Sequence, residues 1–266
     1  MSVVAASAAS RAHARAAAES LAAIRDRAPR IHCITNAAAS VLTANGLLAV
    51  GAVPSLTIAP EEVGDFVSGA DALLINLGTL DETRRAAIAI AIEAATKAGI
   101  PWVLDPVFAD RSPQRLDLAA RLCALRPAVI HANETEIMAL AEKAGREETG
   151  AAGAAAKIAR DSRACVVLTG PEDRVCDATR AAVLSSGHPL MGKVTAMGCA
   201  LGAVTAAFCA VERDPFLAAL EAVLCFGVAG AMAGDKARGP GSFQAELLDA
   251  LYALDAAAIE KRGRVK

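Results

Sequence analysis

Short runs of aliphatic residues alternate with longer stretches of helical periodicity between residues 31 and 169. The short runs predict strands, and the longer stretches between them predict helices. This alternation is typical of βαβ units, in which helices cover both faces of a parallel sheet. The predicted strands are residues 31–34, 53–58, 71–76, 101–104, 128–131 and 164–169, and the clearest helices between them are residues 38–50 and 82–98.

The pattern changes after residue 170. Residues 174–177, 181–185 and 189–194 predict short antiparallel strands or hairpins. Three helices are then predicted at residues 199–211, 215–233 and 242–259, with Pro215 suitably placed in a first turn. No low-complexity linker or internal repeat divides the sequence. We therefore expect a single domain over residues 1–266, with a three-layer α/β/α fold and a mostly parallel central sheet.

Composition and charge exclude several classes of protein. Hydrophobic residues make up 55% of the 266 residues and charged residues 21%, which excludes an intrinsically disordered chain. The formal net charge is −2 and aromatic residues make up 3%. Such a chain lacks the basic surface and the stacking platforms of a nucleic-acid-binding protein. The seven cysteines include no CxxC pair, so neither a zinc site nor a disulfide framework is predicted, and a reducing compartment is favoured.

One uncharged stretch, residues 194–211, is long enough to span a membrane. It is rich in Ala and Gly, so we expect it to form a buried core helix instead. The N-terminal residues are rich in Ala, Ser and Arg and lack the apolar segment of a secretory signal. A transit-like peptide stays open on composition, although an amphipathic helix that ends near Arg25 is favoured. We expect a cytoplasmic protein that binds neither membranes nor nucleic acid.

Polar residues gather where several predicted strands end. They are Thr35 with Asn36, residues 76–79, Asp105, Asn133 with Glu136, and Thr169 with Gly170. Each group alone is an ordinary set of turn or cap residues. Parallel strands, however, bring their carboxyl ends to one rim of the sheet, where ligands bind in such folds. The sequence therefore predicts a ligand site along this rim.

Three segments carry candidate chemistry. Residues 193–201 place small residues before a helix whose first N–H groups would form an anion cradle, although a plain tight turn would look the same. Asn133 and Glu136 have the spacing of a capping box, and Glu136 with Asp105 could equally hold Mg²⁺. Asn36 lies in a stretch without charged side chains, which suits a small neutral heterocycle.

Taken together, these motifs resemble the hydroxyethylthiazole kinase family. The resemblance rests on HCITN (32–36), TANGLLAVGA (43–52), NLGTL (76–80), LDPV (104–107), NETEI (133–137), LTG (168–170), the KVTxxGC segment (193–199) and GPGSFQ (239–244). These motifs follow the family order from about Leu21 to Leu254. Residues 1–20 are then an N-terminal helical extension.

The resemblance implies a ribokinase-like fold and a homotrimer with active sites between subunits. It implies that the γ-phosphoryl group of Mg²⁺-ATP is transferred to the primary hydroxyl of 4-methyl-5-(2-hydroxyethyl)thiazole, a step of thiamine salvage. By position, Asp105 and Glu136 would serve the metal. The residues at the ATP site would be His131, Asn133, Thr169 and Thr195; those of the anion hole and the catalytic turn would be Ala196, Met197, Gly198 and Cys199; and those of the thiazole pocket would be Asn36, Ala38, Leu56 and Ala196.

Several positions depart from the family pattern. Ala196 replaces a Gly, His131 replaces an Arg that contacts ATP, Leu56 replaces a Met, and Ala38 replaces a Val. Phe108 begins a segment that is Gly-rich in the family. These changes surround the expected site and leave three alternatives open. They are a kinase for another small alcohol, a catalytically weakened ligand-binding homologue, and a ribokinase-fold lyase acting on hydrated nicotinamide cofactors. The Cys at position 199, where sugar kinases of this fold have an Asp base, counts against the lyase.

Overall fold

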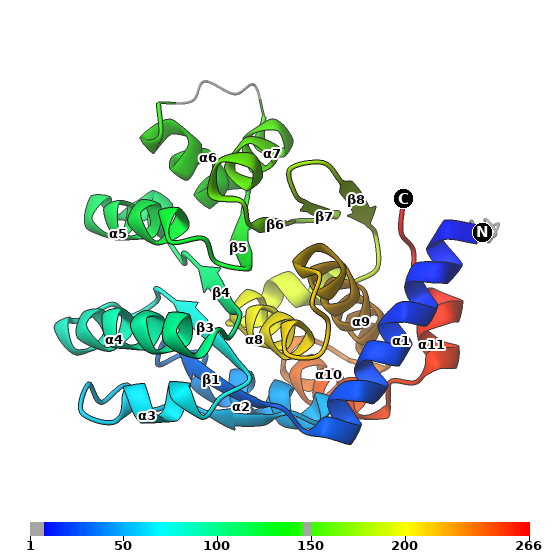
Figure 1. The fold of residues 1–266 in the computed structure, drawn as a ribbon. Coiled ribbons are helices and arrows are strands. Elements are labelled where there is room, and N and C mark those ends of the chain that lie inside the picture. Colours follow the sequence, from blue (N-terminus) through cyan, green and yellow to red (C-terminus); the bar gives the residue numbers. More distant parts are fainter. Residues whose placement is uncertain (1–7, 146–149) are drawn as a thin grey trace.

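The central sheet of the computed structural model has eight strands, in the order β2-β1-β3-β4-β5-β6-β7-β8 (Figure 1). The structure describes residues 8–145 and 150–266, so part of the predicted extension, residues 1–7, lies outside it. Strands β1 to β6 pair in parallel, whereas β7 pairs antiparallel with β6 and β8 pairs antiparallel with β7. The strands are β1 (Arg30–Ile34), β2 (Val53–Ser55), β3 (Ala72–Asn76), β4 (Trp102–Asp105), β5 (Val129–Asn133), β6 (Cys165–Thr169), β7 (Asp173–Cys176) and β8 (Ala181–Leu184).

Helices cover both faces of this sheet (Figure 1). One face carries α3 (Val63–Ser68), α4 (Glu82–Ala98), α5 (Pro113–Ala124), α6 (Glu134–Lys143) and α7 (Ala151–Ser162). The other carries α1 (Ala8–Arg27), α2 (Ser40–Val50), α8 (Met197–Cys209), α9 (Pro215–Lys236), α10 (Pro240–Ala253) and α11 (Ala256–Arg262). Side chains along β3 alternate between the two cores, as a pleated strand requires. The predicted three-layer α/β/α fold is confirmed.

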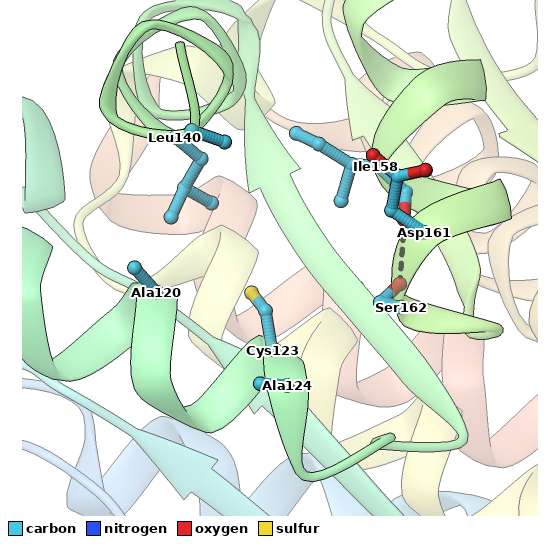
Figure 2. Close-up of a pocket in the computed structure, with 8 residues that line it drawn as sticks. Ala120, Cys123, Ala124, Leu140, Ile158, Asp161 and Ser162 are labelled. Carbon is cyan, nitrogen blue, oxygen red and sulfur yellow. Dashed lines mark hydrogen bonds between the residues drawn. The ribbon is translucent and has the colours of Figure 1, made fainter. Parts of the chain in front are cut away.

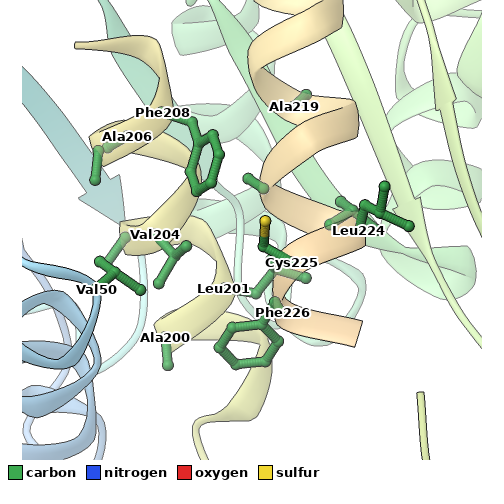
Figure 3. Close-up of a cluster of buried hydrophobic side chains, with 14 of the residues drawn as sticks. Val50, Ala200, Leu201, Val204, Ala206, Phe208, Ala219, Leu224, Cys225 and Phe226 are labelled. Atoms are coloured by element: carbon green, nitrogen blue, oxygen red, sulfur yellow. The ribbon is translucent and has the colours of Figure 1, made fainter. Parts of the chain in front are cut away.

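The core of the second layer is built on α8 and α9, shown in Figure 3. Nearly every side chain of α8 is buried, and the rings of Phe208 and Phe226 lie fully inside this layer. The uncharged stretch at residues 194–211 is therefore a core helix, as predicted. In the described residues, α9 is the one helix long and apolar enough to cross a membrane, and 83% of its most apolar window is buried.

Two predicted elements are wrong and one is too long. Residues 189–194 form a 3₁₀ helix, η2 (Pro189–Lys193), because Pro189 opens it and the His188 ring accepts from the Leu190 amide. The helix predicted over 242–259 breaks after Ala253, and the Asp255 side chain caps α11. Strand β2 ends at Ser55 rather than at residue 58.

Helices α3, α5 and α7 were not predicted, and α5 follows a short 3₁₀ helix, η1 (Ala109–Arg111). The start of α5 carries a sequence signal, because Ser112 caps it and Pro113 occupies its first turn. Helices α5, α6 and α7 enclose a small cavity of about 150 Å³ between Leu140, Ile158 and Cys123 (Figure 2). This cavity lies between helices rather than at the carboxyl ends of the strands.

The N-terminal helix packs against the end of the chain, where α1 lies beside α9 and α11 (Figure 1). Its Arg25 guanidinium donates to the carbonyls of Leu251, Tyr252 and Leu254, at 2.8–3.1 Å.

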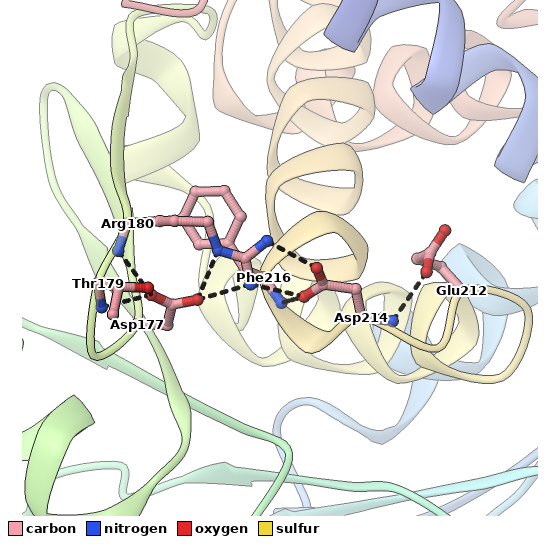
Figure 4. A network of polar contacts seen from close by, with 6 residues as sticks. All are labelled: Asp177, Thr179, Arg180, Glu212, Asp214 and Phe216. Atoms are coloured by element: carbon pink, nitrogen blue, oxygen red, sulfur yellow. Dashed lines mark hydrogen bonds and ion pairs between the residues drawn. The ribbon is translucent and has the colours of Figure 1, made fainter.

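Ion pairs join the β7–β8 turn to the start of α9. Arg180 pairs with Asp177 in the turn and with Asp214, the residue that caps α9 (Figure 4). The Arg180 guanidinium also lies 4.3 Å from the centre of the Phe216 ring.

Candidate active site

Strand register brings the predicted polar residues to one rim of the sheet. Asn76 at the end of β3 is paired with Asp105 at the end of β4, and Asn133 of β5 is paired with Thr169 of β6. Asn36 follows the end of β1 by two residues. Helix α8 begins against this rim, so its Cys199 meets residues at or just beyond the ends of three strands.

A closed set of hydrogen bonds joins four of these side chains. The Asn76 amide nitrogen donates to Asp105 Oδ2 at 2.6 Å and to Cys199 Sγ at 3.1 Å. The Asn36 amide nitrogen donates to Asn76 Oδ1 at 3.1 Å and to Cys199 Sγ at 3.4 Å. All four residues are at most 8% exposed. Three predicted site residues therefore meet in this cluster. Cys199 contacts Asn36 directly, and Asn76 bridges both of them to Asp105.

Burial controls the protonation of this cluster. Burial, followed by the negative charge of Glu136, raises the pKa of Asp105 to about 8. Burial and the nearby Asp105 carboxyl raise the pKa of Cys199 to about 12. A helix N-terminus by itself lowers a thiol pKa, but at Cys199 the desolvation of the thiolate outweighs that effect. Cys199 is a thiol at neutral pH and cannot take a proton from an alcohol.

Glu136 forms the capping box that its spacing predicts. Its two carboxylate oxygens accept from the Asn133 amide at 2.9 Å and from the Phe108 amide at 2.8 Å. Asn133 in turn accepts from the Glu136 amide at 3.0 Å. Burial raises the pKa of Glu136. The structure therefore gives Glu136 a definite structural role, and its carboxylate also adds negative charge to the surroundings of Asp105.

The start of α8 has the geometry of an anion cradle. No side chain among the described residues caps this helix at Ala196, and its first amides have no intrahelical partner. Ala196 itself has φ 65° and ψ 11°, in the left-handed region that favours Gly. The adjacent Thr195 and Gly198 are exposed, whereas Met197 is buried. Ala at position 196 therefore keeps the expected turn at the cost of backbone strain.

A cavity of about 640 Å³ opens beside this helix start. Four predicted residues line it: Asn133, Thr169, Met197 and Gly198. The far wall comes from residues 185–192, which follow β8. This wall approaches α9 so closely that a Cβ at Gly227 would lie 2.4 Å from the Ser186 carbonyl oxygen. Sequence reasoning missed this wall, because its contact with α9 is tertiary.

His131 lies beneath the turn at the start of α8. Its Cε1 is 3.9 Å from the position that a Cβ on Gly198 would occupy. The ring is 2% exposed, and its Nε2 has no hydrogen-bond partner among the described residues. Burial lowers the pKa of His131 to about 4, so the ring is neutral at physiological pH. An unpartnered buried nitrogen at this place suits a bound ligand that completes its hydrogen bonding.

The two apolar residues predicted for the acceptor pocket are less constrained. Ala38 is exposed in the turn before α2, and Leu56 is half-buried just after β2. Leu56 is flanked by two contacts of His32, whose ring nitrogens lie 2.8 Å from Ser55 Oγ and 3.1 Å from the Thr57 carbonyl oxygen. The place of Leu56 in a pocket beside Asn36 stays a prediction.

Asp105 and Glu136 are the two carboxylates predicted to serve a metal, and the negative charge of Glu136 contributes to the raised pKa of Asp105. Within residues 8–145 and 150–266, no three His, Cys, Asp or Glu side chains cluster closely enough to hold a metal alone. Two carboxylates with substrate phosphates are nevertheless an ordinary Mg²⁺ environment. The mutual repulsion that contributes to the raised pKa of Asp105 is what a divalent cation would relieve. The residues fit Mg²⁺ held jointly with a phosphate.

Comparison with known proteins assigns the chain to a family. The model of the hydroxyethylthiazole kinase family matches residues 21–257. The chain belongs to the hydroxyethylthiazole kinase family. A probable hydroxyethylthiazole kinase of Agrobacterium fabrum is 40% identical over 250 residues, with 94% of each chain covered. The hydroxyethylthiazole kinase of Granulibacter bethesdensis is 43% identical over 249 residues, with 91% of each chain covered.

Solved structures agree with this assignment. A hydroxyethylthiazole kinase from Pyrococcus horikoshii is 38% identical and superposes with a TM-score of 0.90, over 94% of this chain and 98% of that one. The pyridoxal kinase of Staphylococcus aureus, in complex with AMP-PCP and pyridoxal, is 17% identical with a TM-score of 0.59, over 77% and 88% of the two chains. The second likeness shows a shared fold alone. This family member is thus a kinase with a ribokinase-like fold, as the sequence motifs predict.

Proposed function

We propose that this kinase transfers the γ-phosphoryl group of ATP to the primary hydroxyl of 4-methyl-5-(2-hydroxyethyl)thiazole in thiamine salvage. The observation that supports this most is the convergence of Asn36, Asp105 and Cys199 at the uncapped start of α8, beside a cavity of about 640 Å³. The choice of the acceptor alcohol is supported by the relatives, which are named hydroxyethylthiazole kinase.

The cavity is the proposed nucleotide site. Thr169 and Asn133 line it, and exposed Thr195 precedes the start of α8. The His131 ring, whose Nε2 is unpartnered among the described residues, lies beneath Gly198. His131 is neutral, so it would supply a hydrogen bond to ATP where an arginine would add a positive charge. The phosphates would then lie against the first amides of α8, at the positive end of the helix dipole.

Phosphoryl transfer needs positioning and charge stabilisation more than covalent chemistry by the enzyme. The amides of residues 197–199 would donate to the migrating phosphoryl group, with Ala196 shaping the turn. Asp105 and Glu136 would hold Mg²⁺, which neutralises charge on the phosphate oxygens when bound. Both Asn36 amide hydrogens are already used, and its Oδ1 accepts from the Ala39 amide, so the second lone pair of Oδ1 would accept from the incoming hydroxyl.

The test is ATP-dependent phosphorylation of the thiazole alcohol, followed by mass spectrometry, with a panel of other small alcohols in parallel. Cys199→Ala should keep measurable turnover, because the thiol is not a base. Asp105→Ala and Glu136→Ala should lose far more. Equal collapse of all three variants would refute this ranking. Turnover of a different alcohol only would replace the proposed acceptor.

The matched control for Glu136 is Glu136→Gln. Gln keeps one carbonyl oxygen and can still cap α6, as capping boxes with Gln do, but its NH2 group cannot accept from the Phe108 amide. We therefore expect a small fall in melting temperature and, if Glu136 serves the metal, a loss of activity at temperatures where the variant is fully folded. Full activity in Glu136→Gln would restrict the residue to its helix cap.

We also propose a homotrimer whose active sites lie between subunits. Four large apolar side chains on α2, β2 and α3 are 44–69% exposed at the margin of the sheet where β2 ends it, and they are Val41, Leu48, Val53 and Phe66. Ala38 and Leu56 adjoin the same elements. Light scattering after gel filtration should give three chains per particle, and Leu48→Lys should dissociate it with loss of turnover. A monomeric, fully active wild-type protein would refute the proposal.

A further inference from the structure

Asn76 occupies the centre of the site, although neither the sequence motifs nor the family comparison gives it a role. It ends β3 and is 0% exposed. It links the acceptor side of the site, at Asn36, with the phosphate side, at Asp105 and Cys199.

Every hydrogen-bonding position of the Asn76 amide is used. Its nitrogen donates to Asp105 and Cys199, and its oxygen accepts from Asn36 and, at 3.0 Å, from the Gly78 backbone amide. A side-chain amide has two donor hydrogens and two acceptor lone pairs, so this set is saturated. An amide held at four points has a fixed orientation, and it presents its donor edge to Asp105 and Cys199.

Gly78 completes this arrangement on the acceptor side. A Cβ at Gly78 would lie 2.6 Å from Asn36 Cβ and 2.8 Å from Asn36 Nδ2. The absence of a side chain at Gly78 therefore lets the β3 turn lie directly against Asn36. Asn36 is held from both directions, by contact with Gly78 and by its hydrogen bond to Asn76.

We propose that Asn76 is a positioning residue. Its hydrogen bonds hold Asp105 and Cys199 in a fixed place relative to Asn36, so that the acceptor hydroxyl and the phosphoryl group are aligned for transfer. The proposal rests on the proposed function, since it assigns Asn36 to the acceptor and Asp105 to the phosphate side. It predicts that changes at Asn76 alter the rate of transfer more than the binding of ATP, because other residues line the nucleotide cavity.

The decisive variant is Asn76→Asp, which keeps the size of the side chain. It can still accept from Asn36 and Gly78 but can no longer donate to Asp105 and Cys199. We expect kcat to fall about 10–100-fold with KM for ATP within about twofold of wild type. Asn76→Ala should also lose kcat, and Gly78→Ala, which displaces Asn36, should mainly raise KM for the acceptor.

Thr205→Val is the control for general loss of stability. Thr205 is buried on α8 below the site and bonds within its own helix, to the Leu201 carbonyl. If Asn76 merely fills space, the uncharged variant Asn76→Leu, which has a side chain of similar size and adds no charge beside Asp105, will keep near-wild-type kcat, and that result overturns the proposal. A parallel fall in kcat for Thr205→Val at equal melting temperature would overturn it too.

The acceptor assignment is tested separately in the same experiment. Wild-type protein is first assayed with the thiazole alcohol and the alcohol panel, which decides the proposed function. The ratio of variant to wild-type kcat is then measured with whichever alcohol is phosphorylated. A different acceptor would change the proposed function and leave the test of Asn76 intact.

Discussion

Glu221 on α9 is a buried acid, and it makes the stability of the protein depend on pH. Its side chain is 1% exposed, and its Oε2 has no hydrogen-bond partner among the described residues. Burial raises its pKa to about 7 from 4.5, a hydrogen bond from Ser20 opposes this, and the negative charges of Glu212, Glu19 and Asp214 add to it. Between pH 4.5 and 7, the folded protein therefore keeps Glu221 protonated, whereas the unfolded chain releases this proton.

The sign and size of the effect follow from this difference. Below pH 4.5 both states are protonated and no penalty arises, whereas between pH 4.5 and 7 stability falls as pH rises. Each unit of pKa shift is worth about 1.4 kcal/mol. The rise from 4.5 to about 7 therefore lowers the free energy of unfolding by about 3 kcal/mol once the pH is above 7. Glu221→Gln removes the titration. We expect the variant to equal wild type near pH 4.5 and to exceed it by about 2–3 kcal/mol at pH 8.

The assay is urea unfolding followed by circular dichroism at pH 4.5, 6, 7 and 8. A gain of this size corresponds to about 4–10 °C in melting temperature for a chain of this length. Glu142→Gln, at an exposed position of α6, is the matched control and should leave the pH dependence unchanged. Parallel pH curves for wild type and Glu221→Gln would show that the carboxyl is ionised in the folded protein, contrary to our reasoning.

Three further predictions follow from single sites. Ala196→Gly should stabilise the protein by about 0.5–1 kcal/mol in urea unfolding, because relief of left-handed strain exceeds the entropy cost of Gly; a loss of stability would show that Ala196 is unstrained. Arg180→Ala should cost about 1–2 kcal/mol at low salt and less at 1 M NaCl, since partly exposed ion pairs are screened; equal losses would assign the effect to Phe216 packing. Cys199 should react with iodoacetamide at pH 7.5 more slowly than half-buried Cys123, as measured by peptide mass mapping, because its pKa is about 12; faster labelling of Cys199 would contradict that pKa.

The sequence predicts the layered fold because hydrophobic periodicity is local. Strands β1, β3 and β6 and helix α4 lie within a residue of their predicted bounds. Capping chemistry is local as well, so the Asn133–Glu136 box was predictable and is observed. Residues 189–194 were misassigned because a short apolar run with Pro fits a strand and a 3₁₀ turn equally.

The chemistry of the site depends on contacts that no local pattern encodes. Asn76 in sequence is an ordinary strand-end residue, and its four hydrogen bonds exist because β3, β4 and α8 meet in a particular register. The position of Cys199 at a helix N-terminus would by itself lower its pKa, yet burial beside Asp105 outweighs that effect. Position along the chain predicts which residues meet at a rim, whereas depth of burial, which decides their protonation, comes from tertiary packing.

The docking of α1 against α9 and α11 has a consequence for synthesis on the ribosome. The first described helix buries Leu21 and Ile24, and its Arg25 reaches carbonyls at residues 251–254. These partners are synthesised some 230 residues later, so the apolar face of α1 stays uncovered during most of translation. A nascent chain of this kind invites chaperone binding at its leading end, and release should coincide with arrival of the final helices.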